Sequence, residues 1–278
     1  MRTDSSEGRR TDFPLLYAAA TLCLIITVAP FAWMFLSSIK PTSEILKMPP
    51  VWLPSTITFE HYRRLWSSAF ASSMVNSAVV SISITLTTIL VNSMAGFAFA
   101  KYRFPGRERL FTLLLATMMI PGQVTMIPVF ILLKYLGLLN SYTGLVLPGT
   151  ASVFAIFLMR QFMMGIPDSV LEAARLDGAS EPRLFAQIVL PLAMPAIATL
   201  VIFTFMASWN EFLWALIIML DESKYTVPVA LAALNGQYGT DWGLLMAGSV
   251  VTILPVLGVF LLMQKHYIRG IATSGLKG

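Results

Sequence analysis

A carboxylate, an amide and an indole stand together in one of the most apolar parts of the chain, the sequence SWNEF at residues 208–212. An ionised carboxylate is costly in hydrocarbon, so Glu211 is a candidate functional residue if this segment crosses a membrane. Glu211 and Asn210 offer hydrogen bonds to a hydroxyl-rich ligand, and the ring of Trp209 offers a stacking face for a sugar. The alternative is structural, with Asn210 and Glu211 tying neighbouring helices or subunits together.

Three further polar residues lie in apolar runs. Gln123 belongs to MMIPGQVTMIP, in which Pro121 and Pro128 each remove a backbone donor. Broken helices at membrane depth persist only where protein or a water-filled cavity satisfies the freed carbonyls, so Gln123 either faces a cavity or bonds a neighbouring helix. Asn76 is a weaker candidate for a residue of the substrate path. Both Asn76 and Asn92 are expected to form hydrogen bonds between helices.

Enzymatic chemistry has no support in this sequence. No nucleophile–base pair is recognisable, and the single cysteine, Cys23, makes no metal site with the scattered His61 and His266. The phosphate-binding pattern G-x-x-x-x-G-K-[ST] is absent, because the chain contains no Gly-Lys dipeptide. We therefore expect no catalytic residue, no metal and no cofactor bound by this chain.

The most charged segment between long apolar runs is IPDSVLEAARLDGASEPRLFAQIVLP, residues 166–191. It predicts two short helices with a break at Gly178, since a residue without Cβ enters the left-handed region at little cost. Ser169 and Glu172 fit an S-x-x-E capping box, and Asp168 is a rival N-cap. The apolar side of this segment comprises Leu171, Ala174, Leu184 and Ile188. The rest of the chain offers too little apolar surface to cover that side, so we expect the segment to need a partner.

The composition predicts a membrane protein. Of 278 residues, 56% are hydrophobic and 12% are charged, whereas about a quarter of a soluble domain is charged. The net charge of +5 fits lysine- and arginine-rich loops of a membrane protein, so we expect no nucleic acid as a partner.

Six apolar runs are long enough to cross a bilayer at about 1.5 Å per residue. They cover residues 14–37, 72–100, 110–135, 145–164, 196–220 and 244–264. The predicted organisation is a tail (1–13), a first span (14–37), an ordered extracytoplasmic loop (38–70), a five-span core (71–265) containing a charged loop (165–194), and a second tail (266–278).

The basic residues orient these spans. Six spans place both termini on one side, and that side holds thirteen of the nineteen lysines and arginines. The bias predicts that both termini and the charged loop are cytoplasmic.

The charged segment also resembles a known family. Glu172-Ala173-Ala174, three residues, Gly178, nine residues and then Ile188-x-Leu190-Pro191 is similar to the EAA signature of permease subunits of ABC importers. In that family the segment is the coupling helix, which docks into a cleft on the ATPase subunit. The resemblance implies an ATPase-coupling site; its residues are Glu172, Ala173, Ala174, Asp177, Gly178, Ile188, Leu190 and Pro191.

The resemblance extends along nearly the whole chain, to MalG-type permeases of carbohydrate-uptake ABC importers. The residues that carry it include SSIKPTSEI, LPSTITFEHYRRL, KYRFPGR, MMIPGQVTMIPVF, SWNEFLWALI and YIRGIATSGLKG. It implies an all-α polytopic fold of six transmembrane helices, the type I importer (MetI-like) permease fold, in the cell membrane. The implied partners are ATPase subunits that hold ATP and Mg, a second, MalF-like permease subunit, an extracytoplasmic substrate-binding protein and membrane lipid.

Three alternatives stay open. An ABC importer permease for another solute, such as a glycerol phosphodiester, a peptide, an amino acid or phosphate, would share the coupling loop. A proton- or sodium-driven carrier needs coupled ionisable groups at mid-depth, and only Glu211 qualifies. A scaffold or sensor subunit would show no substrate-dependent ATPase activity in any complex.

Overall fold

The computed structural model describes residues 8–236 and 239–274. The regular secondary structure of these residues is helical except for one short hairpin, and the chain divides into two compact units, which are described separately. The first unit contains Met1–Ser68 and Leu234–Val251, and the second contains Ala69–Ala233 and Thr252–Gly278. The predicted tails lie in part outside the described residues, at 1–7 and 275–278.

The first unit begins with the long helix α1 (Gly8–Ser38), which starts earlier than the predicted span. Its other elements are α2 (Thr42–Ile45), α3 (Glu60–Trp66), β1 (Asn235–Gly236), β2 (Gly239–Thr240) and the start of α15 (Trp242–Ser274). The two strands pair antiparallel, with Asn235 opposite Thr240.

The loop after α1 is ordered around a buried lysine. The Nζ of Lys40 donates to the carbonyl of Val51 and lies 4.2 Å from the centre of the Trp33 ring. The Nε2 of His61 lies 2.8 Å from the carbonyl oxygen of Lys40, which connects α3 to this loop.

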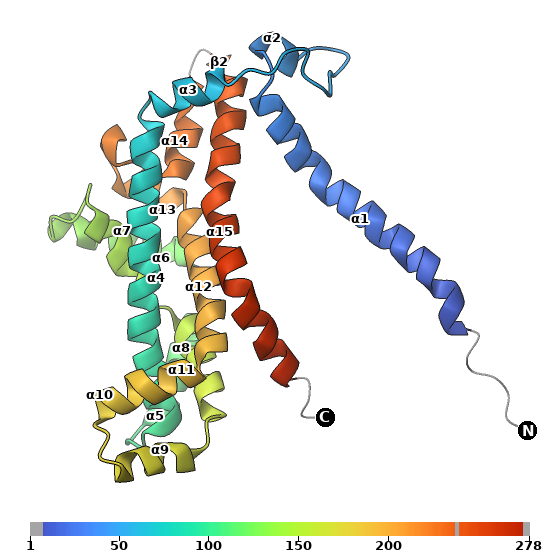
Figure 1. The fold of residues 1–278 in the computed structure, drawn as a ribbon. Coiled ribbons are helices and arrows are strands. Elements are labelled where there is room, and N and C mark those ends of the chain that lie inside the picture. The colour runs from blue at the N-terminus through green and yellow to red at the C-terminus, as the bar shows by residue number, and fades with distance from the viewer. Residues whose placement is uncertain (1–7, 237–238, 275–278) are drawn as a thin grey trace, which may run out of the picture. The chain divides into compact units, whose positions relative to one another are not determined.

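The second unit is organised on α4 (Phe70–Lys101), the long teal helix in Figure 1. Helices α8 (Val153–Met164) and α12 (Met194–Trp209) pack along it. A Cβ added at Gly96 would lie 2.6 Å from the Cβ of Met159, so α4 and α8 approach each other closely at this glycine.

The remaining elements of this unit are α5 (Arg107–Thr117), α6 (Gly122–Tyr135), α7 (Tyr142–Gly149), α9 (Asp168–Leu176), α10 (Glu181–Leu184), the π-helix η1 (Phe185–Val189), α11 (Leu190–Leu192), α13 (Leu213–Ile218), the 3₁₀ helix η2 (Glu222–Lys224) and α14 (Val227–Ala233).

Six spans are compatible with the described residues. Three stretches are each long and apolar enough to cross a membrane, namely Leu16–Ser38, Phe70–Lys101 and Trp242–Lys265. Three bent pairs also qualify when each is taken as one span: α5 with α6 (98°), α7 with α8 (45°), and Glu181–Leu192 with α12 (79°).

The predicted break in the third span is present. Helix α5 ends at Thr117, and Pro121, which has no backbone donor, is the N-cap of α6. The bend of 98° means that α6 turns away from the direction of α5.

The predicted span over residues 196–220 is not one continuous helix in the structure. Helix α12 ends at Trp209 and α13 begins at Leu213. A side-chain oxygen of Glu211 accepts a hydrogen bond from the backbone N–H of Trp214 (3.0 Å), which gives α13 its own N-terminal partner. The polar residues of SWNEF therefore form a break between two helices.

Candidate functional site

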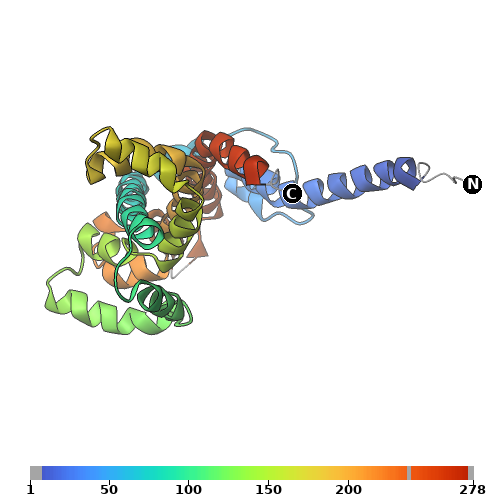
Figure 2. The same cartoon turned by 90° about the horizontal axis from the view of Figure 1, so that it is seen from below.

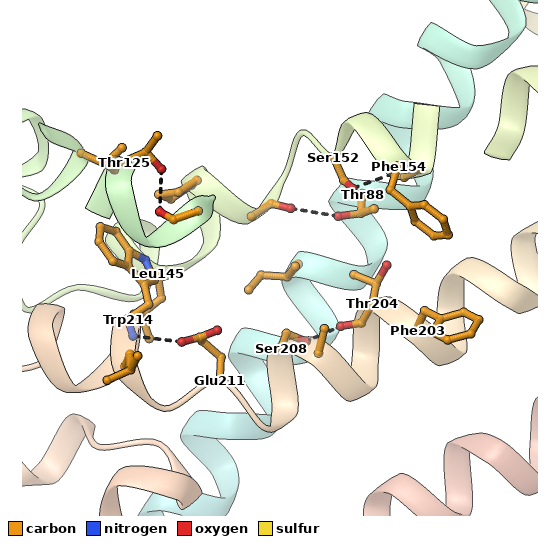
Figure 3. Close-up of a pocket in the computed structure, with 18 of the residues that line it drawn as sticks. Thr88, Thr125, Leu145, Ser152, Phe154, Phe203, Thr204, Ser208, Glu211 and Trp214 are labelled. Carbon is orange, nitrogen blue, oxygen red and sulfur yellow. Dashed lines mark hydrogen bonds between the residues drawn. The ribbon is translucent and has the colours of Figure 1, made fainter. Parts of the chain in front are cut away.

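An open cavity of about 660 Å³ lies within the second unit (Figure 3). It is bordered by α4, α6, α7, α8, α12 and α13, so segments from much of this unit contribute to it. Its polar lining residues are Thr88, Gln123, Thr125, Ser152, Thr204, Ser208 and Glu211, and Trp214 is its one indole. No lysine, arginine or histidine is among the described residues that line it.

The hydroxyl groups of this lining are oriented by the backbone. Thr125 donates to the carbonyl of Gly122 (2.8 Å), and Ser208 donates to the carbonyl of Thr204 (2.8 Å). Thr88 donates across to the carbonyl of Gly149 (3.1 Å). A hydroxyl that has used its hydrogen in this way keeps acceptor capacity only, so these oxygens favour ligands that donate hydrogen bonds.

Glu211 lies at the edge of this cavity. One carboxylate oxygen accepts from the N–H of Trp214, and Figure 3 shows the carboxylate close to that residue. The second oxygen has no protein partner in the described part of the chain. Glu211 therefore starts α13 and also presents an acceptor to the cavity.

Of the substrate-path candidates Gln123 and Asn210, only Gln123 lines the cavity. Gln123 lines the cavity from the first turn of α6. Asn210 does not line it, since its amide donates to the carbonyl of Met206 (2.8 Å) on its own helix.

Trp209 was predicted as a stacking face and does not serve as one for this cavity. It is 1% exposed, stacks on Phe205 at 5.5 Å and donates its Nε1–H to the carbonyl of Thr252 (3.1 Å). Trp214, five residues later, lines the cavity instead. Trp214 is part of the same sequence, SWNEFLWALI, but the spacing of residues along a helix does not show which of the two tryptophans faces the cavity.

Asn76 and Asn92 act as interhelical hydrogen bonders. The amide of Asn76 donates to the carbonyls of Ser223 and Tyr225 and accepts from the hydroxyl of Tyr142 (2.8 Å). Asn92 bonds the break between α7 and α8, donating to the carbonyl of Thr150 (2.8 Å) and accepting from the N–H of Ser152 (2.9 Å). Neither residue lines the cavity.

The charged loop folds as two short helices separated at Gly178, as predicted. Gly178 has φ +81°. Its N–H donates to the carbonyl of Arg175 (3.0 Å), and the N–H of Ala179 donates to the carbonyl of Ala174 (3.0 Å). This pair of bonds is the Schellman motif, which satisfies the last carbonyls of α9.

A π-helical turn follows within the same loop. Pro191 has no N–H, and its ring would clash with the carbonyl four residues earlier in a regular helix. The wider turn η1 immediately precedes it, with the N–H of Leu190 donating to the carbonyl of Phe185. The Ile188-x-Leu190-Pro191 part of the signature thus coincides with this irregular turn.

The predicted capping box is not formed. Pro167 is the N-cap of α9, and no side-chain cap bond is made there. The carboxylate of Asp168 instead accepts from the Nζ of Lys101 (2.7 Å) at the end of α4. A contact between residues far apart in sequence has replaced the local one.

Two residues at the end of α4 hold this loop. Lys101 Nζ also donates to the carbonyl of Ile166 (2.6 Å), and the hydroxyl of Tyr102 donates to Glu181. Glu181 in turn pairs with Arg175 (2.8 Å) across the turn. Figure 2 shows the yellow loop helices beside the end of α4.

The charge pairs lower the pKa of both carboxyl groups. The hydrogen bond from Lys101 holds the pKa of Asp168 below its usual range, and the hydrogen bond from Arg175 does the same for the pKa of Glu181. Burial and the neighbouring Glu181 raise the pKa of Tyr102. The loop is therefore ionised at neutral pH and is tied to α4 by charge.

The prediction that the apolar side of the loop needs a partner is wrong. Leu171, Ala174 and Leu184 are buried in a core cluster that includes Phe97 and Met159, and Ile188 packs against it. The long helix α4 and helix α8 supply the missing cover.

The opposite face of α9 is open. Glu172, Ala173 and Asp177 are exposed, and Leu176 is 88% exposed. The position of Leu176 between Ala174 and Gly178 was not singled out from the sequence. Ala174, by contrast, belongs to the core and positions the helix.

Comparisons with known proteins agree with this geometry. A profile of the family described as "Binding-protein-dependent transport system inner membrane component" matches residues 92–272. The arabinooligosaccharides transport system permease protein AraQ of Halalkalibacterium halodurans is 35% identical over 268 residues, covering 95% of this chain and 96% of that protein. The sn-glycerol-3-phosphate transport system permease protein UgpE of Salmonella typhi is 34% identical over 277 residues, covering 96% of this chain and 99% of that protein.

A solved structure shares the fold. It is a crystal structure of a bacterial ABC transporter involved in the import of the acidic polysaccharide alginate, with a TM-score of 0.81 and 26% identity. The match covers 96% of this chain and 100% of that chain. Because the family profile covers well over half of the sequence and these relatives align over nearly their full length, this chain belongs to the binding-protein-dependent transport system inner membrane components, the membrane-spanning permease subunits of ABC importers.

Proposed function

We propose that the chain imports a neutral, hydroxyl-rich sugar, and that it forms the membrane path together with a second permease subunit. The names of its relatives support carbohydrate as the substrate class, since one is a permease for arabinooligosaccharides and a structural neighbour serves alginate import. An extracytoplasmic binding protein delivers the sugar, and partner ATPase subunits hold ATP and Mg²⁺.

The observation that carries this proposal is the character of the cavity. The hydroxyl oxygens of Thr88, Thr125 and Ser208 and the second oxygen of Glu211 are acceptors, and the hydroxyl groups of a sugar can donate to them. Gln123 has no hydrogen bond within the described residues and can donate as well as accept. Apolar residues such as Phe154, Phe203 and Trp214 supply surfaces for the apolar faces of a sugar ring.

A phosphate ester is the second candidate, because the UgpE relatives are permeases for sn-glycerol-3-phosphate. An anionic solute is favoured by a cation or by several N–H donors in its path. The described lining of this cavity offers a carboxylate and no basic side chain, so this half of the path favours a neutral solute over an anion.

Orientation and coupling belong to the same proposal. The basic residues favour cytoplasmic termini and a cytoplasmic coupling loop, where the ATPase subunits are. The exposed face of α9, with Glu172, Ala173 and Asp177, is the docking surface. Ala174, Gly178, Ile188, Leu190 and Pro191 shape the loop that presents it.

Helix α4 connects the two sites. Its last residue, Lys101, holds the coupling loop, and Thr88, earlier on the same helix, lines the cavity. A displacement of the loop by the ATPase therefore changes the position of a cavity wall. Such coupling requires two conformations of the transporter, and ATP and the loaded binding protein must both favour the same conformation.

Substitutions at Glu211 separate a ligand contact from a capping role. Glu211→Gln keeps an oxygen for the N–H of Trp214 but removes the charge, whereas Glu211→Ala removes both. If the carboxylate binds sugar, uptake into proteoliposomes by the complete transporter falls roughly tenfold or more in both variants, because hydrogen bonds to charged groups contribute about 1.5–3 kcal/mol. Wild-type uptake by Glu211→Gln, with loss only in Glu211→Ala, would show that Glu211 serves α13 alone.

A matched pair of threonines gives the control. Thr125 lines the cavity, Thr117 does not, and each donates to a carbonyl three residues earlier. Thr125→Ala is expected to lower sugar uptake several-fold, while Thr117→Ala leaves it unchanged. Equal effects of the two substitutions would count against this cavity as the path.

A further inference from the structure

The segment 102–109, which connects α4 to α5 and includes the first residues of α5, carries an excess of positive charge. Arg103, Arg107 and Arg109 come from this segment, Arg160 comes from α8, and Glu108 is the acidic residue among them. Glu108 is shared by two of the arginines, since its carboxylate lies 2.8 Å from Arg107 and 3.2 Å from Arg160. The positive charge of this cluster is therefore neutralised only in part.

The other two arginines are exposed and unpaired. Within residues 8–236 and 239–274, the guanidinium groups of Arg103 and Arg109 make no hydrogen bond or ion pair. Both line an open concavity of about 530 Å³, together with Phe104, Gly106, Arg107 and Glu108, whose carboxylate is already paired with Arg107 and Arg160. An arginine offers a planar fork of donors that matches a phosphate oxygen pair.

Apolar side chains continue from this basic concavity along α5. Phe104 is exposed beside Arg103, and Leu110 and Leu113 are exposed on the first turns of the helix. Helix α5 is also part of a bent pair that qualifies as a membrane span. Basic groups at the start of such an element, followed by exposed leucines, match the boundary between lipid headgroups and acyl chains.

We propose that this concavity binds the headgroup of an anionic phospholipid, with its phosphate between Arg103 and Arg109 and its acyl chains along Leu110 and Leu113. The site lies two residues beyond Lys101, which holds the coupling loop through Asp168. A bound lipid would thus stabilise the end of α4 from which that loop is positioned. The proposal concerns a surface outside the cavity and does not depend on which sugar is carried.

The test titrates the purified complete transporter, this chain with its partner permease and ATPase subunits, with phosphatidylglycerol or phosphatidylcholine. Bound lipids are counted by native mass spectrometry. R103Q/R109Q is expected to weaken binding of the tightest phosphatidylglycerol roughly thirtyfold, since each basic side chain near anionic lipid changes binding about fivefold. R103K/R109K, which keeps the charge, is expected to recover most of this binding.

The control is K47Q/R63Q, which removes two exposed basic residues from the first unit. It should bind phosphatidylglycerol as the wild type does. Equal phosphatidylglycerol binding by R103Q/R109Q and wild type would overturn the proposal, as would equally tight binding of phosphatidylcholine. Displacement of the lipid by inorganic phosphate would indicate a free-anion site instead, and loss of the ATPase subunits from R103Q/R109Q with unchanged lipid binding would indicate a protein contact.

Discussion

Gly178 allows the coupling loop to be tested through its backbone alone. Its φ is +81°, and a Cβ built at this position would meet nothing within 4 Å. Any side chain therefore pays only a conformational penalty, about 1–2 kcal/mol for an L-residue in the left-handed region and more when the side chain is β-branched. We expect Gly178→Ala to destabilise the loop conformation by about 1 kcal/mol and Gly178→Val by about 2 kcal/mol or more.

These penalties predict a graded loss of coupling. A change of about 1–2 kcal/mol alters the population of the native loop roughly five- to thirtyfold. Gly178→Asn should be mild, because asparagine tolerates this region better than other residues with a Cβ. The assay is the ratio of sugar taken up to ATP hydrolysed in proteoliposomes that contain the complete transporter. Gly178→Val should insert and assemble normally but hydrolyse ATP with little uptake.

Gly137 supplies the matched control. It has φ +68°, has no neighbour within 4 Å of a built Cβ, and lies between α6 and α7, away from the loop. Gly137→Val should lower stability by a similar amount and leave the ratio of uptake to hydrolysis unchanged. Wild-type uptake by Gly178→Val, or uncoupling by Gly137→Val to the same extent, would refute the reasoning.

Other predictions concern packing and charge in the second unit. Gly96→Ala should lower the melting temperature of the purified subunit, because its Cβ would lie 2.6 Å from that of Met159, whereas Gly258→Ala, in open space, should not. Asn92→Leu should cost about 2–4 kcal/mol by leaving two backbone groups at the α7–α8 break unpaired, and an unchanged denaturation midpoint would contradict this. Since Lys101 lowers the pKa of Asp168 in the folded protein, the stabilisation is present at neutral pH and is lost as the pH falls below about 4. Asp168→Asn should therefore melt below wild type at pH 7, and the difference should shrink as the pH falls below about 4 and the carboxyl group of the folded wild type becomes protonated. A difference that does not change with pH would exclude this cause.

Local chemistry was enough to predict some features of the chain. The turn at Gly178 follows from a glycine after a helical run, and the break before α6 follows from Pro121. The apolar runs indicated the membrane spans, because length and hydrophobicity depend on the segment itself. These features need no knowledge of neighbouring elements.

Features that depend on distant contacts were not predictable in this way. The capping box is absent because α9 begins at Asp168, one residue before Ser169, and the rival cap Asp168 binds Lys101, 67 residues earlier. Trp209 is covered by Phe205 and bonds the carbonyl of Thr252, so its burial is decided by tertiary packing. The cover of Leu171 and Leu184 likewise comes from α4 and α8. Periodicity within a segment cannot show which surface another segment will occupy.

The measurement that tests the central claim most directly is the ATPase activity of the complete transporter in lipid nanodiscs. The activity is titrated with the binding protein, either empty or loaded with each member of a panel of sugars, glycerol phosphates and peptides. Stimulation by the binding protein when loaded with a neutral sugar is the result that we expect, and it would identify the substrate. Stimulation only by a glycerol phosphate or a peptide would contradict the carbohydrate assignment, and failure of any ATPase subunit to co-purify would contradict the role of the coupling loop.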